Sequence, residues 1–175
     1  MITVEGSVQS VRILIADDHE VMRGGLRSLL ESLPKWEVCG EAADGLEAVE
    51  KAKHLRPDVV VLDINMPALN GLEAVRLIKK EVPQTQVVIL SRYEAAEMRS
   101  KALEAGAREY VPKSQNLARE LLAAIDQIVR ERPLSYPAAQ VPQPEASSEG
   151  ASTADSETEF YESRASAKTN GNPRA

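Results

Sequence analysis

Between Val11 and Arg132, short apolar runs alternate with longer segments of helical periodicity, and this alternation constrains the fold more than any other feature. Runs such as VVVL and VVIL are continuous, which is typical of strands buried on both faces. Five such strands separated by helices predict an α/β domain with a five-stranded parallel sheet. The expected strands are Val11–Ala16, Trp36–Glu41, Asp58–Leu62, Gln86–Leu90 and Glu109–Val111.

Three of the intervening segments carry an apolar stripe with the spacing of an amphipathic helix. Aromatic residues make up only 3% of the chain, so the core must be aliphatic. We expect five helices that cover both faces of the sheet, a doubly wound arrangement. The three stripes consist of Val21, Leu26, Leu29, Leu30 and Leu33; of Leu72, Val75, Leu77 and Ile78; and of Leu117, Leu121, Leu122, Ile125, Ile128 and Val129.

The composition changes sharply after residue 132, where the apolar periodicity ends. Beyond that point the large aliphatic and phenylalanine residues are Leu134, Val141 and Phe160. Such a segment buries too little apolar surface to offset the entropy lost on ordering it. We therefore predict a loose N-terminal lead over residues 1–10, a domain over residues 11–132, and a disordered Pro/Ser/Glu-rich tail over residues 133–175.

Charge and composition exclude several classes of protein. The formal net charge of −6 argues against the broad basic surface of a stand-alone nucleic-acid-binding protein. The single cysteine, Cys39, excludes an internal disulfide framework and fits a reducing compartment. No apolar run approaches the roughly 20 residues of a membrane span, and the N-terminus lacks a signal-peptide profile. We expect a cytoplasmic protein without a membrane partner.

Polar residues stand where the predicted strands end. Asp17 and Asp18 follow the first strand, Asp63 the third, Ser91 the fourth and Lys113 the fifth. Each has an ordinary explanation taken alone, such as a helix cap for the aspartates, a turn for the serine or a solvated lysine. Parallel α/β sheets place their sites beyond the carboxyl ends of the strands, so these five side chains are expected to converge.

The chemistry that uses such a set is phosphoryl transfer. Two adjacent carboxylates repel each other, and a hard cation such as Mg²⁺, which prefers oxygen ligands, would relieve that repulsion. One carboxylate is then able to act as a nucleophile and form an acyl phosphate. A lysine and a hydroxyl would spread the charge on the phosphoryl oxygens. Asp63, on the central strand, is the expected nucleophile.

The segment Val11–Arg132 resembles a bacterial two-component response-regulator receiver domain of the NarL/FixJ branch. The matching stretches are ILIADDHEVMRGGLRSLL, VVVLDINMPALNGLEAV, VVILS and AGAREYVPKS, in the family's order and spacing. The resemblance implies a flavodoxin-like (βα)5 fold with strand order 2-1-3-4-5. It also implies that Asp63 is the phospho-acceptor and that Asp17 and Asp18 bind Mg²⁺ with it. The backbone carbonyl of Asn65 would supply a further metal ligand.

By the same resemblance, Ser91 would donate to the phosphoryl group and Lys113 would pair with it. Tyr110 matches the family's switch aromatic, which turns inward when the hydroxyl residue moves toward the phosphate. The chain departs from the family at Ser114, where a proline with a cis peptide often follows the lysine. Pro112 lies within the last predicted strand, which requires that strand to be an edge of the sheet.

The resemblance implies that the phosphoryl group comes from a sensor histidine kinase or a phosphotransfer protein. NarL/FixJ members usually carry a DNA-binding domain after the receiver, whereas this tail shows no recognition helix. We therefore expect a single-domain regulator without direct DNA binding, whose output is protein contact or phosphorelay, with a phosphorylation-dependent dimer left open. Apart from autocatalytic phosphotransfer and autodephosphorylation, we expect no enzymatic activity.

Three alternatives remain. The chain could be a truncated or degenerate transcriptional regulator. It could also be a receiver-like binding module that is never phosphorylated, although the complete residue set argues against this. The third alternative is a phosphatase of the haloacid-dehalogenase type. Those enzymes need a second aspartate, the general acid, two residues after the nucleophile, and here that position is Asn65, which argues against this alternative.

Overall fold

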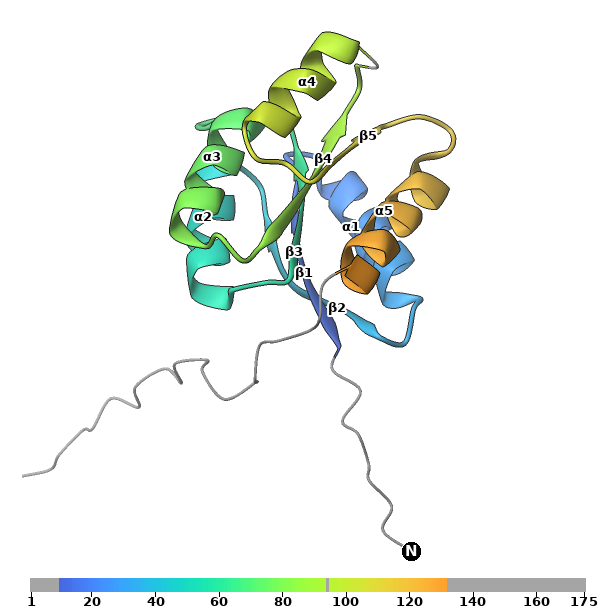
Figure 1. The fold of residues 1–175 in the computed structure, drawn as a ribbon. Helices are drawn as coiled ribbons and strands as arrows, with labels where there is room; N and C mark the ends of the chain where they lie inside the picture. Colours follow the sequence, from blue (N-terminus) through green and yellow to red (C-terminus); the bar gives the residue numbers. More distant parts are fainter. Residues whose placement is uncertain (1–9, 94, 132–175) are drawn as a thin grey trace, which may run out of the picture. The chain divides into compact units, whose positions relative to one another are not determined.

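The structure is a computed structural model that describes residues 10–93 and 95–131. Within these residues it contains a single five-stranded sheet and five helices in strict alternation (Figure 1). No helix in the described part of the chain is long and apolar enough to cross a membrane. The predicted disordered tail, and the predicted lead except for Ser10, lie outside the described residues.

All strand pairs are parallel, and the strand order is β2-β1-β3-β4-β5. The predicted fold class is thereby confirmed. The strands are β1 (Val11–Ala16), β2 (Trp36–Ala42), β3 (Val59–Asp63), β4 (Gln86–Ser91) and β5 (Glu109–Pro112). The helices are α1 (Glu20–Glu31), α2 (Gly45–Leu55), α3 (Gly71–Glu81), α4 (Ala96–Glu104) and α5 (Leu117–Glu131).

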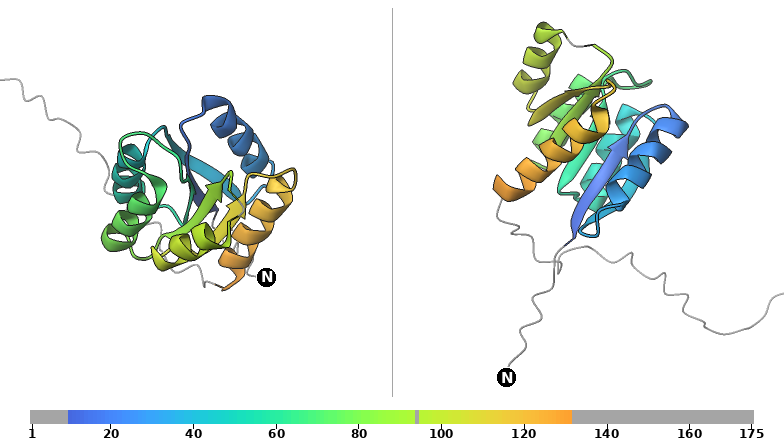
Figure 2. Two further views of the ribbon diagram at one scale, coloured as in Figure 1. Left: turned by 90° about the horizontal axis from the view of Figure 1, so that it is seen from above. Right: turned by 90° about the vertical axis from the view of Figure 1, so that its right-hand side faces the viewer.

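The sheet is covered on both faces, which explains the continuous apolar runs of its central strands. Helices α1 and α5 lie on one face, and α2, α3 and α4 lie on the other (Figure 2). Successive residues of a strand point to opposite faces. Ile13 of β1 therefore packs in the core beneath α1 and α5, while Leu14 packs beneath the other three helices. Truncating either fully buried side chain to alanine would cost about 2–5 kcal/mol.

Two helices begin directly after short polar residues that precede a glycine, Asp44 before α2 and Asn70 before α3. Asp44 is the N-cap of α2, and its side chain accepts a hydrogen bond from the backbone N–H of Glu47 at 2.9 Å. Asn70 does the same for α3, with Glu73 N–H at 3.0 Å. Each cap satisfies a backbone donor that the helix itself leaves unpaired, which contributes about 1 kcal/mol. These caps fix where α2 and α3 leave the carboxyl edge of the sheet.

Strands β2, β3, β4 and β5 each end one residue later than the sequence predicts, and in β3 and β4 the added residue belongs to the predicted site. Asp63 is the last residue of β3 and pairs with Leu90, while Ser91 is the last residue of β4 and pairs with Pro112. The parallel ladder thus continues into the polar residues, so both side chains are carried by regular sheet rather than by loops. Pro112 ends β5, which is an edge strand as its missing N–H requires.

Candidate functional site

The residues predicted at the strand ends converge at the carboxyl edge of the sheet. Lys113, which directly follows β5, lies between two of the aspartates: its Nζ is 2.6 Å from Asp17 Oδ2 and 3.0 Å from Asp63 Oδ1. Asp17 comes from the β1–α1 loop, and Asp63 from the end of β3. The sheet therefore brings together side chains that are up to 96 residues apart.

Asp63 is a buried carboxylate with little compensation. Its side chain is fully buried, and neither carboxylate oxygen accepts a hydrogen bond from any described residue. The contact with Lys113 is an ion pair without hydrogen-bond geometry. Burial raises the pKa of Asp63, the nearby Lys113 opposes that rise, and Asp17 and Asp18 add to it. Poorly solvated oxygens of this kind are open to an electrophile or a cation.

Asp17 is also fully buried, but it is well satisfied. Its Oδ2 accepts from Lys113, and its Oδ1 accepts from the backbone N–H of His19 at 2.9 Å. The lysine side chain is only 6% exposed, so its ammonium is available to these two carboxylates and little to water. One ammonium between two buried carboxylates leaves a net negative charge, to which neighbouring Asp18 adds. The site therefore favours an added cation.

Asp18 supplies an accessible carboxylate beside this pair, with its side chain 33% exposed. His19 Nδ1 lies 2.7 Å from Asp18 Oδ1 and 3.3 Å from Asp17 Oδ1. One ligand atom from each of these three residues lies within 4.8 Å of the others. Together with the orphaned oxygens of Asp63, this donor set fits a hard divalent cation that keeps several waters.

The helix-cap alternative for the two aspartates is not what the structure shows. The N-cap of α1 is His19, whose side chain makes no cap hydrogen bond. Asp17 instead directs its carboxylate to Lys113, and Asp18 directs its own to His19. Both acids are thus left at the carboxyl edge of the sheet.

Ser91 and Tyr110 each form a hydrogen bond with the backbone of Tyr93, in the β4–α4 loop. Ser91 is fully buried, and its Oγ accepts a hydrogen bond from the backbone N–H of Tyr93 at 3.1 Å. Tyr110 is buried on β5, and its hydroxyl donates to the backbone carbonyl of Tyr93. Asn65 lies exposed in the loop after β3. The roles predicted for Ser91, Tyr110 and Asn65 stay predictions.

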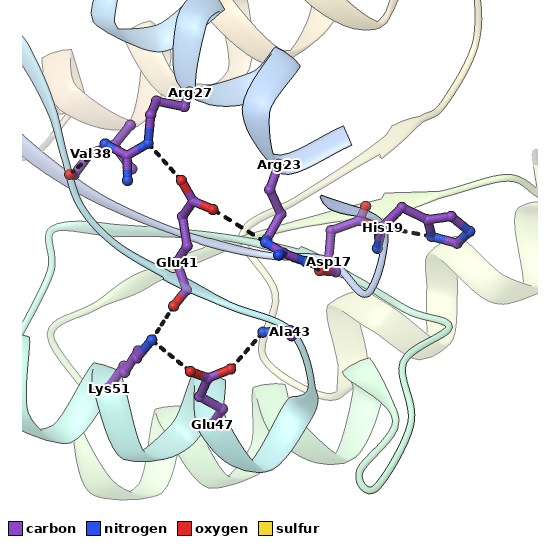
Figure 3. A network of polar contacts seen from close by, with 9 residues as sticks. All are labelled: Asp17, His19, Arg23, Arg27, Val38, Glu41, Ala43, Glu47 and Lys51. Carbon is purple, nitrogen blue, oxygen red and sulfur yellow. Dashed lines mark hydrogen bonds and ion pairs between the residues drawn. The ribbon is translucent and has the colours of Figure 1, made fainter. Parts of the chain in front are cut away.

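The sequence patterns missed two sets of polar neighbours. Arg92 Nη2 lies 3.1 Å from His19 Nε2, a contact across 73 residues that joins the β4–α4 loop to the β1–α1 loop. Arg23, on α1, donates from Nη1 to the backbone carbonyl of Asp17 at 2.7 Å (Figure 3). Arg23 lies within a helix, so the rule that located the acids at strand ends could not find it. Arg92 directly follows β4, but its position in the sequence does not indicate a contact with His19.

Gly71, the first residue of α3, lets the start of this helix pack closely against the backbone of Asp63 and Ile64. A Cβ at Gly71 would lie 2.3 Å from the Asp63 carbonyl oxygen and 2.7 Å from Ile64 Cα, both of which are backbone atoms that cannot move aside alone. The Gly71 N–H also donates to the Ile64 carbonyl at 2.8 Å. The close approach therefore holds the backbone of the candidate nucleophile.

Gly71→Ala is expected to lower the free energy of unfolding by about 1–3 kcal/mol, because the added methyl group overpacks the backbone after β3. The matched control is Gly24→Ala in α1, where a Cβ would meet nothing within 4 Å. That change is expected to raise stability by about 1 kcal/mol, because alanine is the better helix former. Urea unfolding followed by circular dichroism measures both. Equal effects of the same sign would contradict the close-approach explanation.

Comparison with known proteins agrees with this geometry. Residues 13–126 match the response regulator receiver domain, and the chain belongs to this family. The predicted family is confirmed. Receiver domains are the signal-accepting parts of two-component response regulators, and the family generally binds Mg²⁺ and partners with histidine kinases or phosphotransfer proteins.

Individual relatives carry different names. A protein-glutamate methylesterase/protein-glutamine glutaminase of Pyrococcus abyssi is 42% identical over 123 residues, which are 69% of this chain and 33% of that protein. The response regulator GacA of Pseudomonas viridiflava is 37% identical over 115 residues, or 66% of this chain and 53% of the relative. The response regulator domain of Thermotoga maritima CheB superposes with a TM-score of 0.66 at 41% identity, covering 71% of this chain and all of that domain.

The chain thus spans between about a third and about half of the length of these two curated relatives. The similarity covers the receiver, so it supports phosphorylation chemistry and does not extend to the output of either relative.

Proposed function

We propose that this chain is a phospho-accepting response regulator in which Asp63 takes a phosphoryl group from the phosphohistidine of a sensor histidine kinase or a phosphotransfer protein. The observation that carries the proposal is the buried carboxylate of Asp63, whose two oxygens lack hydrogen bonds from the described residues while Lys113 Nζ lies 3.0 Å away. The carboxylate oxygens of Asp63 are therefore available as nucleophiles, and Lys113 is positioned as the counter-ion of the aspartyl phosphate that would form.

In this reaction one Asp63 oxygen forms a bond to phosphorus while the bond from phosphorus to the histidine nitrogen breaks. The electron pair of that bond stays on the imidazole, which leaves and takes up a proton from solvent. Lys113 is placed to neutralise charge on the phosphoryl oxygens as the aspartyl phosphate forms. Ser91, buried at the end of the neighbouring strand β4, supplies a hydroxyl donor for one of those oxygens.

Asp17, Asp18 and Asp63, with the Asn65 carbonyl, would hold Mg²⁺ at this edge. When bound there, the ion would supply positive charge that offsets the charge of the phosphoryl oxygens. The donor chemistry supports this assignment, because carboxylate and carbonyl oxygens are the ligands that Mg²⁺ prefers. Removing Mg²⁺ with a chelator is expected to stop phosphorylation.

We further propose that phosphorylation changes a protein-interaction surface through Ser91 and Tyr110, and that the output is protein contact or onward phosphotransfer. The hydrogen bonds that both residues make to Tyr93 support this, since they connect the site to the β4–α4 loop. The Ser91 hydroxyl would donate to the new dianion while its oxygen accepts from the Tyr93 N–H, so a movement of Ser91 toward the phosphoryl group would displace the β4–α4 loop. We place the protein in the cytoplasm and expect no direct DNA binding and no turnover of a separate substrate.

The test is the intact mass of the protein after incubation with acetyl phosphate and Mg²⁺. The wild-type chain is expected to gain one phosphoryl group, and Asp63→Asn and a chelator-treated sample are expected to gain none. No gain by the wild-type chain, under conditions that modify a known receiver, would contradict the proposal and favour a binding module that works without phosphorylation. Gain by Asp63→Asn would place the acceptor elsewhere.

A further inference from the structure

Arg23 contacts the acidic loop from outside the candidate site. It lies on α1, its side chain is 15% exposed, and its Nη1 donates to the backbone carbonyl of Asp17 at 2.7 Å (Figure 3). Its Nε donates to Glu41 Oε2 at 3.2 Å. The two donors of one planar guanidinium therefore join the β1–α1 loop to strand β2, an arrangement that a single ammonium cannot reproduce.

Glu41 is the fixed end of this connection. Its second oxygen accepts from Arg27 Nε at 2.6 Å, and the two arginines lower the pKa of Glu41, Arg27 more than Arg23. The backbone carbonyl of Glu41 accepts from Lys51 Nζ, and Lys51 also pairs with Glu47 at 2.6 Å. Helices α1 and α2 thus both hold the end of β2, which makes Glu41 a firm support for Arg23.

The carbonyl that Arg23 holds belongs to the peptide that joins Asp17 to Asp18. The backbone N–H on the other side of Asp17 donates to the Ala42 carbonyl at 3.1 Å, also at the end of β2. With both of these groups fixed, the peptide plane that leads into Asp18 has one orientation. Asp18 is partly exposed, and its carboxylate contacts His19 Nδ1 at 2.7 Å. Its position therefore depends strongly on that peptide plane.

We infer that Arg23, supported by Glu41, is a positioning residue that orients the Asp17–Asp18 peptide for cation binding. This inference rests on the proposed function, in which both aspartates hold Mg²⁺. Mg²⁺ demands near-ideal octahedral geometry, so freedom in the peptide between two of its ligands lowers affinity. Groups that orient metal ligands in this way typically change metal affinity by about 10- to 100-fold when they are removed.

The experiment compares Arg23→Met with Arg27→Met in the full chain, with Mg²⁺ affinity measured by isothermal titration calorimetry. Arg27 is the matched control because it also pairs with Glu41, while its other contacts among the described residues are with Glu31 and the backbone carbonyl of Val38. Arg23→Met is expected to raise the dissociation constant for Mg²⁺ about tenfold or more. Arg27→Met is expected to change it by less than about twofold, within the scatter of surface ion pairs.

Three further measurements separate positioning from a general loss of stability. Unfolding in chelator establishes that both variants are folded at the temperature of the titration. Acetyl phosphate reactivity against Mg²⁺ concentration should show a raised half-saturating Mg²⁺ for Arg23→Met and a maximal rate near that of the wild-type chain. Arg23→Lys keeps the charge but gives up one of the two contacts, so its affinity should fall between those of wild type and Arg23→Met.

Unchanged Mg²⁺ affinity in a folded Arg23→Met or Arg23→Lys variant would overturn the inference and leave the proposed function standing. Equal losses in the Arg23→Met and Arg27→Met variants would also overturn it, because the effect would then come from Glu41 and not from the Asp17 carbonyl. If the wild-type chain bound no Mg²⁺ and gained no phosphoryl group, the proposed function and this inference would fall together.

Discussion

Lys113→Met is expected to lower the free energy of unfolding in Mg²⁺-free buffer by about 3–5 kcal/mol, the range found when one partner of a buried ion pair is removed. Lys113 Nζ is 2.6 Å from Asp17 Oδ2 and 3.0 Å from Asp63 Oδ1, and all three side chains are almost completely buried. Methionine fills a similar volume but leaves two carboxylates facing each other without a cation. The destabilisation should come from charge and not from a cavity.

Urea unfolding at pH 7 measures this effect, with Lys101→Met as the matched control. Lys101 pairs with Glu97 at 2.6 Å on the exposed face of α4, where solvent screens the pair and its loss should change stability little. Adding Asp63→Asn to Lys113→Met should restore part of the lost stability, since one of the two unpaired charges is gone. Equal effects of the two lysine substitutions would mean that the buried ammonium does not stabilise this site.

The fold followed from the sequence because its main determinants are local. The run from Val59 to Leu62 is fully apolar, and only a strand with both faces covered accommodates that pattern. Asp44 and Asn70 mark helix starts because their short side chains cap the backbone N–H groups that follow. The strand ends were placed one residue early at Asp63 and Ser91, because apolar character stops before backbone pairing does.

The candidate site was predictable only as a set of positions. In a parallel sheet the strand ends meet at one edge, so the backbone alone predicts that Asp17, Asp63 and Lys113 approach one another. The oxygen that accepts from each donor depends on side-chain rotamers and on strand register, and neither can be derived from the sequence pattern. The sequence therefore could not show that Lys113 pairs with Asp17 at 2.6 Å, or that Arg23 reaches the Asp17 carbonyl. The contact of His19 with Asp18 was likewise not foreseen.

Asp63→Asn is expected to raise the free energy of unfolding in Mg²⁺-free buffer, in contrast to Lys113→Met, by about 1–3 kcal/mol, because a neutral amide costs less to bury than a charged carboxylate. The substituted amide would carry no charge into the buried position, and Lys113 would keep its 2.6 Å contact with Asp17. A substitution at the candidate acceptor is expected to stabilise the protein, because residues that serve binding and reaction often lower the stability of the ligand-free protein.

The pH dependence gives this prediction a second measurement. Burial raises the pKa of Asp63 above its ordinary value of 3.8, so the folded state disfavours the ionised form. The destabilisation is then absent below the unfolded-state pKa, grows as the pH rises, and is complete above the folded-state pKa. The stability difference between Asp63→Asn and wild type should therefore be largest at neutral pH and shrink toward about pH 4. A difference that stays constant across this range would mean that charge is not its cause.

If Mg²⁺ binds as proposed, a sufficient concentration of it should make the wild-type chain more stable than Asp63→Asn. A ligand that binds only the folded state stabilises it by about 2.7 kcal/mol at one hundred times its dissociation constant. The wild-type chain should gain that stabilisation, whereas Asp63→Asn, having lost a ligand, should gain less. Asp44→Asn is the matched control, because asparagine caps a helix about as well as aspartate and the Asp44 carboxylate accepts from the Glu47 N–H in the α2 cap. It should respond to Mg²⁺ as the wild-type chain does, and an equal response from Asp63→Asn would show that Asp63 is not part of the cation site.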